Sequence, residues 1–267
     1  MFRIRTVSLL LILLLFVSAA PALAGKVLDG IVERGEIRVG MTGSQPPLNV
    51  MSKSGTLIGY EVDLVEILAD SMGVKAKLVI LPFPELLSAL KKGDVDMVVS
   101  GMTITPERNT QVAFVGPYLL TGKSILTKSE TLAAVADVIE IDTESVTLTA
   151  LAGSTSQEFA EVVIPNAKLQ TTDDYDKAIK LVMDGQADAM IADIEICQLT
   201  VLRYPDSGLA TLTDPLTIEP VGIALPPGDP LLINLVENYL SALDMVGLLE
   251  QLHDAWYTDG SWLIQLP

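Results

Sequence analysis

The chain has 267 residues, with 34 Asp and Glu against 17 Lys and Arg, and a formal net charge of −17. A chain this acidic does not bind nucleic acid through phosphate contacts, which need clustered basic residues. One Cys and one His exclude an intrachain disulfide, disfavour a transition-metal or zinc site, and leave only His253 for a catalytic triad. We therefore expect no metal and no cofactor, and a fold that depends on its hydrophobic core.

The N-terminus has the pattern of a secretory signal. Arg3 and Arg5 precede an unbroken apolar run over residues 9–17, and Ala22-Leu23-Ala24 fits an A-x-A cleavage site. The run is too short to span a bilayer comfortably, although an uncleaved anchor stays an alternative. No Cys follows it, which disfavours a lipid anchor. We expect residues 1–24 to be removed and the exported chain to begin near Gly25.

The next part of the chain alternates strands and helices. Apolar residues at helical spacing predict a helix over residues 62–72, which Gly73 ends. Residues 51–56 are typical of a hairpin tip. Strand, helix, strand, helix, strand is a parallel α/β pattern. The remaining predicted elements here are strands at 37–40, 75–81 and 94–99 and a helix at 85–92 that ends at Gly93.

A second α/β unit follows, and it resembles the first in plan. It is separated from the first by the acidic, poorly periodic stretch 131–145, which lacks the glycine turn and spacing of a calcium-binding hand and is better explained as a solvated face. The predicted strands are 123–128, 146–150, 167–170, 187–192 and 222–225, and the predicted helices are 157–163, 174–184, 231–246 and 248–257.

The loop Ser100–Arg108 is the strongest candidate for a binding site. It follows the predicted strand 94–99 and precedes a further strand candidate at 111–115. In open α/β sheets such loops line the ligand crevice. Arg108 offers a planar two-pronged donor and Thr103 a hydroxyl, which together suit a small carboxylate. A surface Thr and an Arg on a solvated turn are the alternative.

Three further places could carry chemistry. Ser154 and Thr155 stand where a strand gives way to a helix, whose free N–H groups attract a carboxylate, although they also fit an ordinary helix cap. Asp193 follows the strand 187–192 and could receive an ammonium or serve as an N-cap. Phe83, between two prolines, could pack on a ligand side chain or lie at the edge of the core.

Several motifs in register resemble family 3 of the bacterial extracellular solute-binding proteins, the polar amino acid receptors of periplasmic transporters. They are "LIGYEVDLVEILADSMGV", "SGMTITPER", "GSTSQEF", "GQADAMIAD" and the closing "WYTDGSWL". The resemblance implies the type II periplasmic-binding-protein fold, two α/β lobes joined by two strands with the ligand in the cleft. We expect lobe 1 to comprise residues 25–121 and 221–267, and lobe 2 residues 122–220.

The resemblance also implies a role for each matching residue. Arg108 would pair with the α-carboxylate of the ligand, and Thr103, Ser154 and Thr155 would help to bind it. Gly101 would offer its carbonyl to the α-ammonium, Asp193 would neutralise that ammonium, and Phe83 would form a side-chain wall. The cation of one lobe and the anion of the other would then complement a zwitterion.

Three positions depart from the family pattern. Gln45 replaces an aromatic residue that many relatives stack on the ligand, with Leu48 in place of a nearby Phe, and Thr42 replaces an acidic residue of basic-amino-acid receptors. These departures disfavour Arg, Lys or His as the ligand. They favour a polar or modestly apolar amino acid and leave room for another kind of ligand, with Gln45 in the site.

The sequence thus predicts a monomeric periplasmic receptor without catalytic activity, which binds a small amino acid-like ligand and delivers it to the membrane permease of an ABC importer. A cyclohexadienyl dehydratase on the same scaffold is the alternative, because such enzymes resemble family 3 receptors and need a general acid, for which Glu158 or Asp193 could serve. The sensor domain of a membrane kinase is disfavoured, since no kinase segment is present.

Overall fold

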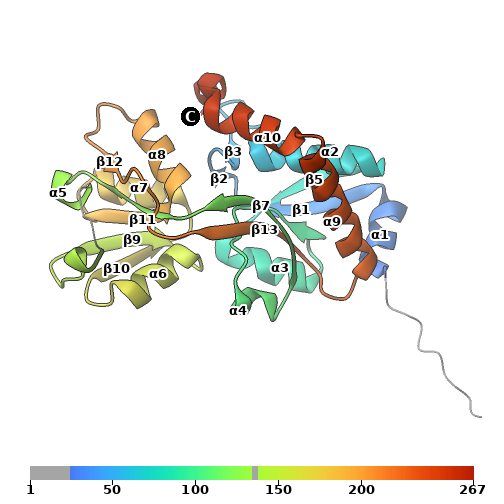
Figure 1. Ribbon diagram of the computed structural model, residues 1–267, viewed down its shortest axis with the longest axis horizontal. Coiled ribbons are helices and arrows are strands. Elements are labelled where there is room, and N and C mark those ends of the chain that lie inside the picture. The colour runs from blue at the N-terminus through green and yellow to red at the C-terminus, as the bar shows by residue number, and fades with distance from the viewer. Residues whose placement is uncertain (1–24, 134–137) are drawn as a thin grey trace, which may run out of the picture.

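The computed structural model describes residues 25–133 and 138–267, and it forms two α/β lobes side by side (Figure 1). The predicted signal peptide, residues 1–24, lies outside the described residues, as does part of the acidic stretch, residues 134–137. Two long strands, β7 (Ala113–Thr121) and β13 (Glu219–Leu225), run side by side between the lobes. The two-lobed α/β fold expected from the sequence is confirmed.

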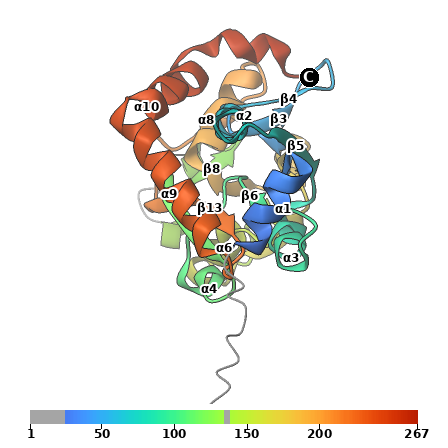
Figure 2. The ribbon, with the colours of Figure 1, turned by 90° about the vertical axis from the view of Figure 1, so that its right-hand side faces the viewer.

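The first lobe is built on a sheet of order β5-β1-β6-β13-β7. Strands β5 (Lys75–Ile80), β1 (Glu36–Met41) and β6 (Met97–Val98) are parallel, whereas β13 is antiparallel to both of its neighbours. Helices lie on both faces of this sheet (Figure 2). They are α1 (Lys26–Arg34), α2 (Tyr60–Met72), α3 (Leu86–Lys92), α4 (Pro106–Asn109), α9 (Pro230–Met245) and α10 (Leu248–His253), with short turns η1 (Phe83–Glu85), η3 (Asp254–Thr258) and η4 (Gly260–Gln265).

The second lobe repeats this plan with the order β10-β9-β11-β8-β12. Strands β10 (Lys168–Thr172), β9 (Thr147–Leu151) and β11 (Ala189–Asp193) are parallel, and β8 (Lys123–Thr127) pairs antiparallel with β11 and with β12 (Ala210–Thr211). The repeated unit predicted from the sequence therefore exists. Its helices are α5 (Glu130–Ala133), α6 (Thr155–Val163), α7 (Tyr175–Met183) and α8 (Ile194–Arg203), with the turn η2 (Val138–Ile141).

A small antiparallel sheet lies next to the cleft end of the first lobe. It consists of β2 (Ser44–Gln45), β3 (Asn49–Met51) and β4 (Leu57–Ile58), and the connection between β3 and β4 is the predicted hairpin tip. Gly59, which follows β4, has no room for a side chain, because a Cβ there would lie 2.1 Å from the backbone oxygen of Leu48. The hairpin is thereby held close to the start of α2.

In the described residues no single helix is long and apolar enough to cross a membrane. Only the helix pair Pro230–Met245 and Leu248–Thr258 passes such a test together, and the two helices are bent by 80° relative to each other.

The two connections between the lobes cross in close contact at Gly122, which separates β7 from β8. A Cβ at this position would lie 1.8 Å from the carbonyl oxygen of Thr217, in the chain that leads into β13. The neighbouring Lys123 N–H donates to the hydroxyl of Thr217 at 2.9 Å, so the two connections are also hydrogen-bonded. Only glycine allows this approach.

We expect Gly122→Ala to lower the free energy of unfolding by about 1–3 kcal/mol, because a backbone connection must shift to admit the methyl group. Urea denaturation measures this change. Gly228→Ala is the matched control, since nothing lies within 4 Å of a Cβ at Gly228 and its φ is not positive. Equal losses of stability in the two variants would contradict the close crossing.

Candidate functional site

Arg108 lies between the lobes and binds both of them. Its Nη1 donates to the carbonyl oxygen of Thr103 at 2.9 Å, and its Nη2 donates to the carbonyl oxygen of Gly153, in the second lobe, at 3.0 Å. The guanidinium carbon lies 5.7 Å from the centre of the Phe83 ring, a cation–π contact. Burial lowers the pKa of Arg108, and the charges of Glu158, Glu219 and Asp193 oppose that change.

The loop that carries Thr103 and Arg108 is hydrogen-bonded to a buried carboxylate. Glu61, fully buried in α2, accepts from the backbone N–H of Gly101 at 2.7 Å and from the Asn49 side chain at 2.6 Å, and it also accepts from the hydroxyl of Tyr118. Burial raises the pKa of Glu61, while these three hydrogen bonds oppose the change. Gly101 has a φ of 55°, which glycine adopts without strain.

Gln45 is buried at the first-lobe side of the cleft. Its Oε1 accepts from the hydroxyl of Ser100 at 2.5 Å and from that of Thr42 at 2.8 Å. A Cβ at Gly101 would lie 2.8 Å from Gln45 Nε2, so the amide packs directly against the binding loop. Two of the three positions that depart from the family pattern, Thr42 and Gln45, are thus hydrogen-bonded to each other.

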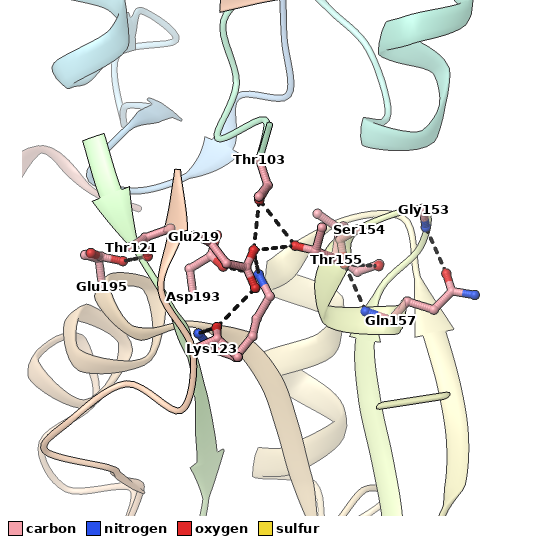
Figure 3. Close-up of polar contacts among 12 residues, drawn as sticks. Thr103, Thr121, Lys123, Gly153, Ser154, Thr155, Gln157, Asp193, Glu195 and Glu219 are labelled. Atoms are coloured by element: carbon pink, nitrogen blue, oxygen red, sulfur yellow. Dashed lines mark hydrogen bonds and ion pairs between the residues drawn. The ribbon is translucent and has the colours of Figure 1, made fainter. Parts of the chain in front are cut away.

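Ser154 caps α6. Its Oγ accepts from the backbone N–H of Gln157 at 3.2 Å and donates to the carbonyl oxygen of Leu151 at 2.6 Å (Figure 3). The first residue of the helix, Thr155, points toward Thr103 of the other lobe, with their hydroxyl oxygens 3.3 Å apart. Of the three hydroxyls predicted to act together, those of Thr103 and Thr155 therefore meet between the lobes, while that of Ser154 caps its own helix.

Asp193 is held by a lysine that sequence reasoning did not single out. It ends β11 and makes no capping hydrogen bond to α8. Instead its Oδ1 lies 2.5 Å from Nζ of Lys123, whose side chain is 1% exposed. The same Nζ lies 2.9 Å from Oε2 of Glu219. Burial alone would lower the pKa of Lys123, but the two carboxylates outweigh it and raise the pKa, so this lysine stays charged.

Glu219, at the start of β13, accepts hydrogen bonds from three threonine hydroxyls. Its Oε2 accepts from Thr103 at 3.0 Å and from Thr155 at 2.8 Å, and its Oε1 accepts from Thr217 at 3.2 Å (Figure 3). Burial would raise the pKa of Glu219, but the charge of Lys123 and the hydrogen bonds lower it. The carboxylate of Glu219 thus accepts from Thr103 and Thr155, two of the hydroxyls that the sequence analysis assigned to the ligand.

Glu195, in the first turn of α8, is a third carboxyl group here, beside Asp193 and Glu219. It accepts a hydrogen bond from the hydroxyl of Thr121, in β7. Burial raises the pKa of Glu195 to about 7; the Thr121 hydrogen bond opposes the change and the charge of Asp193 adds to it. A carboxyl group with this pKa can hold and release a proton near neutral pH.

Where the two lobes meet, the structure thus brings together a cation, paired hydroxyls and acidic groups. The model of the bacterial extracellular solute-binding proteins, family 3, matches residues 37–259. The chain belongs to this family. The resemblance predicted from the sequence motifs is therefore confirmed, and many of the protein's relatives bind amino acids.

Three relatives show the range of the family. The chain is 30% identical to the cyclohexadienyl dehydratase of Pseudomonas aeruginosa over 246 aligned residues. The alignment covers 91% of each of the two chains. The chain is 28% identical to the ABC transporter arginine-binding protein 1 of Escherichia coli, over 83% of this chain and 90% of the relative. It also resembles the structure of a putative ABC transporter binding component of Wolinella succinogenes complexed with lysine, with a TM-score of 0.81 and 35% identity, over 86% and 99% of the two chains.

Sequence reasoning missed three charged residues of this family 3 protein: Lys123, Glu195 and Glu219. Each left a signal. Lys123 begins a strand whose other residues are buried, Glu195 comes two residues after Asp193, and Glu219 precedes the last strand of the sheet. The sequence does not reveal, however, that these three side chains lie close together in the fold. His253, by contrast, is exposed on α10, where its ring stacks on Tyr257 with the centroids 4.4 Å apart.

Proposed function

We propose that this family 3 protein is a periplasmic receptor that binds a small carboxylate-bearing ligand between its lobes. Arg108 carries the proposal, because its guanidinium stands between the two lobes and its two bonds go to carbonyl oxygens. A carboxylate is a stronger partner for a guanidinium than a neutral carbonyl, since both groups are charged and the fork is matched.

In this proposal, ligand binding is coupled to closure of the hinge. The carboxylate takes one or both guanidinium N–H groups and lies near the paired hydroxyls of Thr103 and Thr155 and the first turn of α6, while Phe83 and Gln45 line the first-lobe side. A ligand shifts the hinge toward closure only through better contacts in the closed state. The closed monomer then docks on the permease of an ABC importer, in keeping with the relatives that are ABC transporter-binding proteins. Residues 122 and 220 are the proposed boundaries between the lobes.

A thermal-shift screen of the chain from Gly25 onward tests this proposal. The probes are the standard amino acids, their 2-oxo acid counterparts, arogenate and prephenate. A ligand at a hundredfold excess over its dissociation constant stabilises the protein by about 2.7 kcal/mol, which is easily detected. Stabilisation by at least one of these acids supports a receptor, and no shift with any of them contradicts it.

Glu195 favours a second candidate function, a cyclohexadienyl dehydratase. Its pKa of about 7 lets it act as a general acid near neutral pH, a role that the sequence assigned to Glu158 or Asp193. Asp193 suits that role less well, because its carboxylate is paired with Lys123. Such an acid would protonate the ring hydroxyl of prephenate or arogenate, which leaves as water while the ring carboxylate leaves as carbon dioxide. The similarity to the Pseudomonas dehydratase adds support.

Turnover separates the two candidates. The protein is incubated with prephenate or arogenate at pH 7, and the appearance of phenylpyruvate or phenylalanine is followed with time. Catalytic turnover that Glu195→Gln abolishes, while binding persists, would establish an enzyme. Tight binding of either compound without product would leave the receptor as the function.

A further inference from the structure

Residues 260–267, which we call the C-terminal strap, are anchored on the first lobe. Trp262 of the strap is buried, and its Nε1 donates to the carbonyl oxygen of Trp256 at 3.0 Å. Further along the strap, the carbonyl oxygen of Gln265 accepts from the backbone N–H of Lys53 at 2.8 Å. Because Lys53 lies in the connection between β3 and β4, the strap is fixed to the hairpin of the small sheet.

The strap also contacts α8 of the second lobe. The backbone oxygen of Pro267 accepts from Nη2 of Arg203 at 3.1 Å. Leu199, one turn earlier on the same helix, is 9% exposed and belongs to an apolar cluster that combines both lobes with the strap. The C-terminal end accordingly lies by α8 and β3 (Figure 1). The buried members of the cluster are Val50, Leu199, Trp262 and Leu266.

The second lobe holds these two side chains of α8 in position. Nη1 of Arg203 donates to Oδ1 of Asp176 at 3.2 Å, and its guanidinium carbon lies 5.1 Å from the centre of the Tyr204 ring. The side chain of Arg203 is only 15% exposed. Leu202, next to it in the sequence, is 67% exposed. The helix therefore turns Leu199 and Arg203 toward the strap and Leu202 toward solvent.

This contact lies beside the candidate site and away from the hinge. Val50 belongs to β3, which pairs with β2, the strand that carries Gln45. The hinge crossing at Gly122 is joined to the other end of α8, because its carbonyl oxygen accepts from the first N–H of that helix at 2.9 Å. At about 1.5 Å per residue, Leu199 and Arg203 lie about 8 and about 14 Å further along the helix axis. Opening the hinge on the side of the candidate site would therefore pull α8 from the strap.

We infer that the C-terminal strap holds the two lobes together and biases the unliganded protein toward the closed state. When the hinge opens, Leu199 leaves the apolar cluster and Arg203 loses its acceptor, so water reaches apolar surface that was buried. The bond to Lys53 stays within the first lobe and does not oppose opening. Such a bias raises the apparent affinity for any ligand that binds the closed state, because that state is already populated.

Pulsed electron–electron resonance on the ligand-free protein measures the open and closed populations. One spin label is attached to each lobe, at Glu66→Cys in α2 and Lys168→Cys in β10, both exposed positions. Cys197 is fully buried and stays unlabelled. The protein is unfolded in urea and refolded beforehand, so that bound small molecules are removed. We expect the wild type to show mainly one distance, that of the closed lobes, and a wild type found mainly open would overturn the inference.

The double variant Leu199→Ala with Arg203→Ala should raise the ratio of open to closed protein at least about tenfold, because an apolar contact and a hydrogen bond are both lost. Leu202→Ala is the matched control, since it makes the same substitution at an exposed position of α8, and it should keep the wild-type ratio.

A chain that ends at residue 265 loses the partners from the strap side, Leu266 and Pro267, and should show the same shift as the double variant even if the double variant does not fold. A wild-type ratio in either altered protein, once circular dichroism shows it to be folded, would overturn the inference, as would an equal shift in Leu202→Ala. Because no ligand is present, these results are independent of the proposed binding of a carboxylate.

Discussion

Arg108→Ala should weaken ligand binding by about a hundredfold or more. Truncating one partner of a buried, hydrogen-bonded charge pair costs about 2–5 kcal/mol, much of it because the partner charge is left without a counter-charge. The effect on folding should be about 1 kcal/mol, since the side chain contributes two hydrogen bonds to carbonyl oxygens and a contact with Phe83. Calorimetric titration with the acid found in the thermal-shift screen measures the loss.

Two further variants show whether the geometry of the guanidinium matters. Arg108→Lys keeps the charge but loses the planar fork, so its affinity should lie between those of the wild type and Arg108→Ala. Lys180→Ala removes an exposed lysine of α7 that pairs with Asp184 at the end of the helix, and it should bind normally. Wild-type affinity in Arg108→Ala would mean that the ligand carboxylate lies elsewhere in the protein.

Local patterns in the sequence predicted most elements of the fold. The helix predicted over residues 62–72 is α2, and Gly73 ends it with a φ of 68° and N–H bonds to Ala69 and Asp70. The strand expected at residues 94–99 is shorter, with only Met97–Val98 in the ladder. The reason is local: the carboxylate of Asp96, rather than a backbone carbonyl, accepts from the N–H of Arg38.

Long-range pairing could not be predicted in the same way. The sequence pattern suggested parallel sheets, but β13 lies antiparallel between β6 and β7, from which it is far removed along the chain. Nothing in the composition of β13 specifies its neighbours. They depend on where the second connection crosses the first, at Gly122, and that crossing is a property of the whole molecule.

In the candidate site, too, local features were predicted from the sequence and long-range contacts were not. Thr103 and Thr155 were expected to act together, and their hydroxyls do meet across the cleft. Glu219, their shared partner, was missed because it is 116 residues from Thr103 and belongs to the second connection. Lys123 was assigned to a strand, but a strand pattern does not reveal that its side chain faces Asp193. Single motifs therefore predicted Arg108, the hydroxyls and Asp193 as candidates, whereas Glu219 and the internal ion pairs required the fold.

The stability of the protein should fall as pH rises from about 4.5 to 7 because of Glu195. Its pKa is about 7 in the folded chain against an ordinary value of 4.5, so the folded state binds a proton over this range that the unfolded state has released. Stability decreases with pH wherever the folded state binds more protons. A shift of this size corresponds to a loss of up to about 3 kcal/mol, complete above pH 7.

Glu195→Gln isolates this contribution. The amide can still accept from the hydroxyl of Thr121 but carries no charge, so the variant should match the wild type near pH 4.5 and exceed its stability by up to about 3 kcal/mol at pH 8. Glu61 also has a raised pKa and acts in the same direction, which is why the difference between the two proteins, not the wild-type slope, is informative. Urea denaturation from pH 4.5 to 8 gives that difference, with Glu66→Gln on the exposed face of α2 as the matched control. Parallel curves for wild type and Glu195→Gln would mean that this carboxyl group ionises normally, which would also remove the main support for an acid catalyst in the cleft.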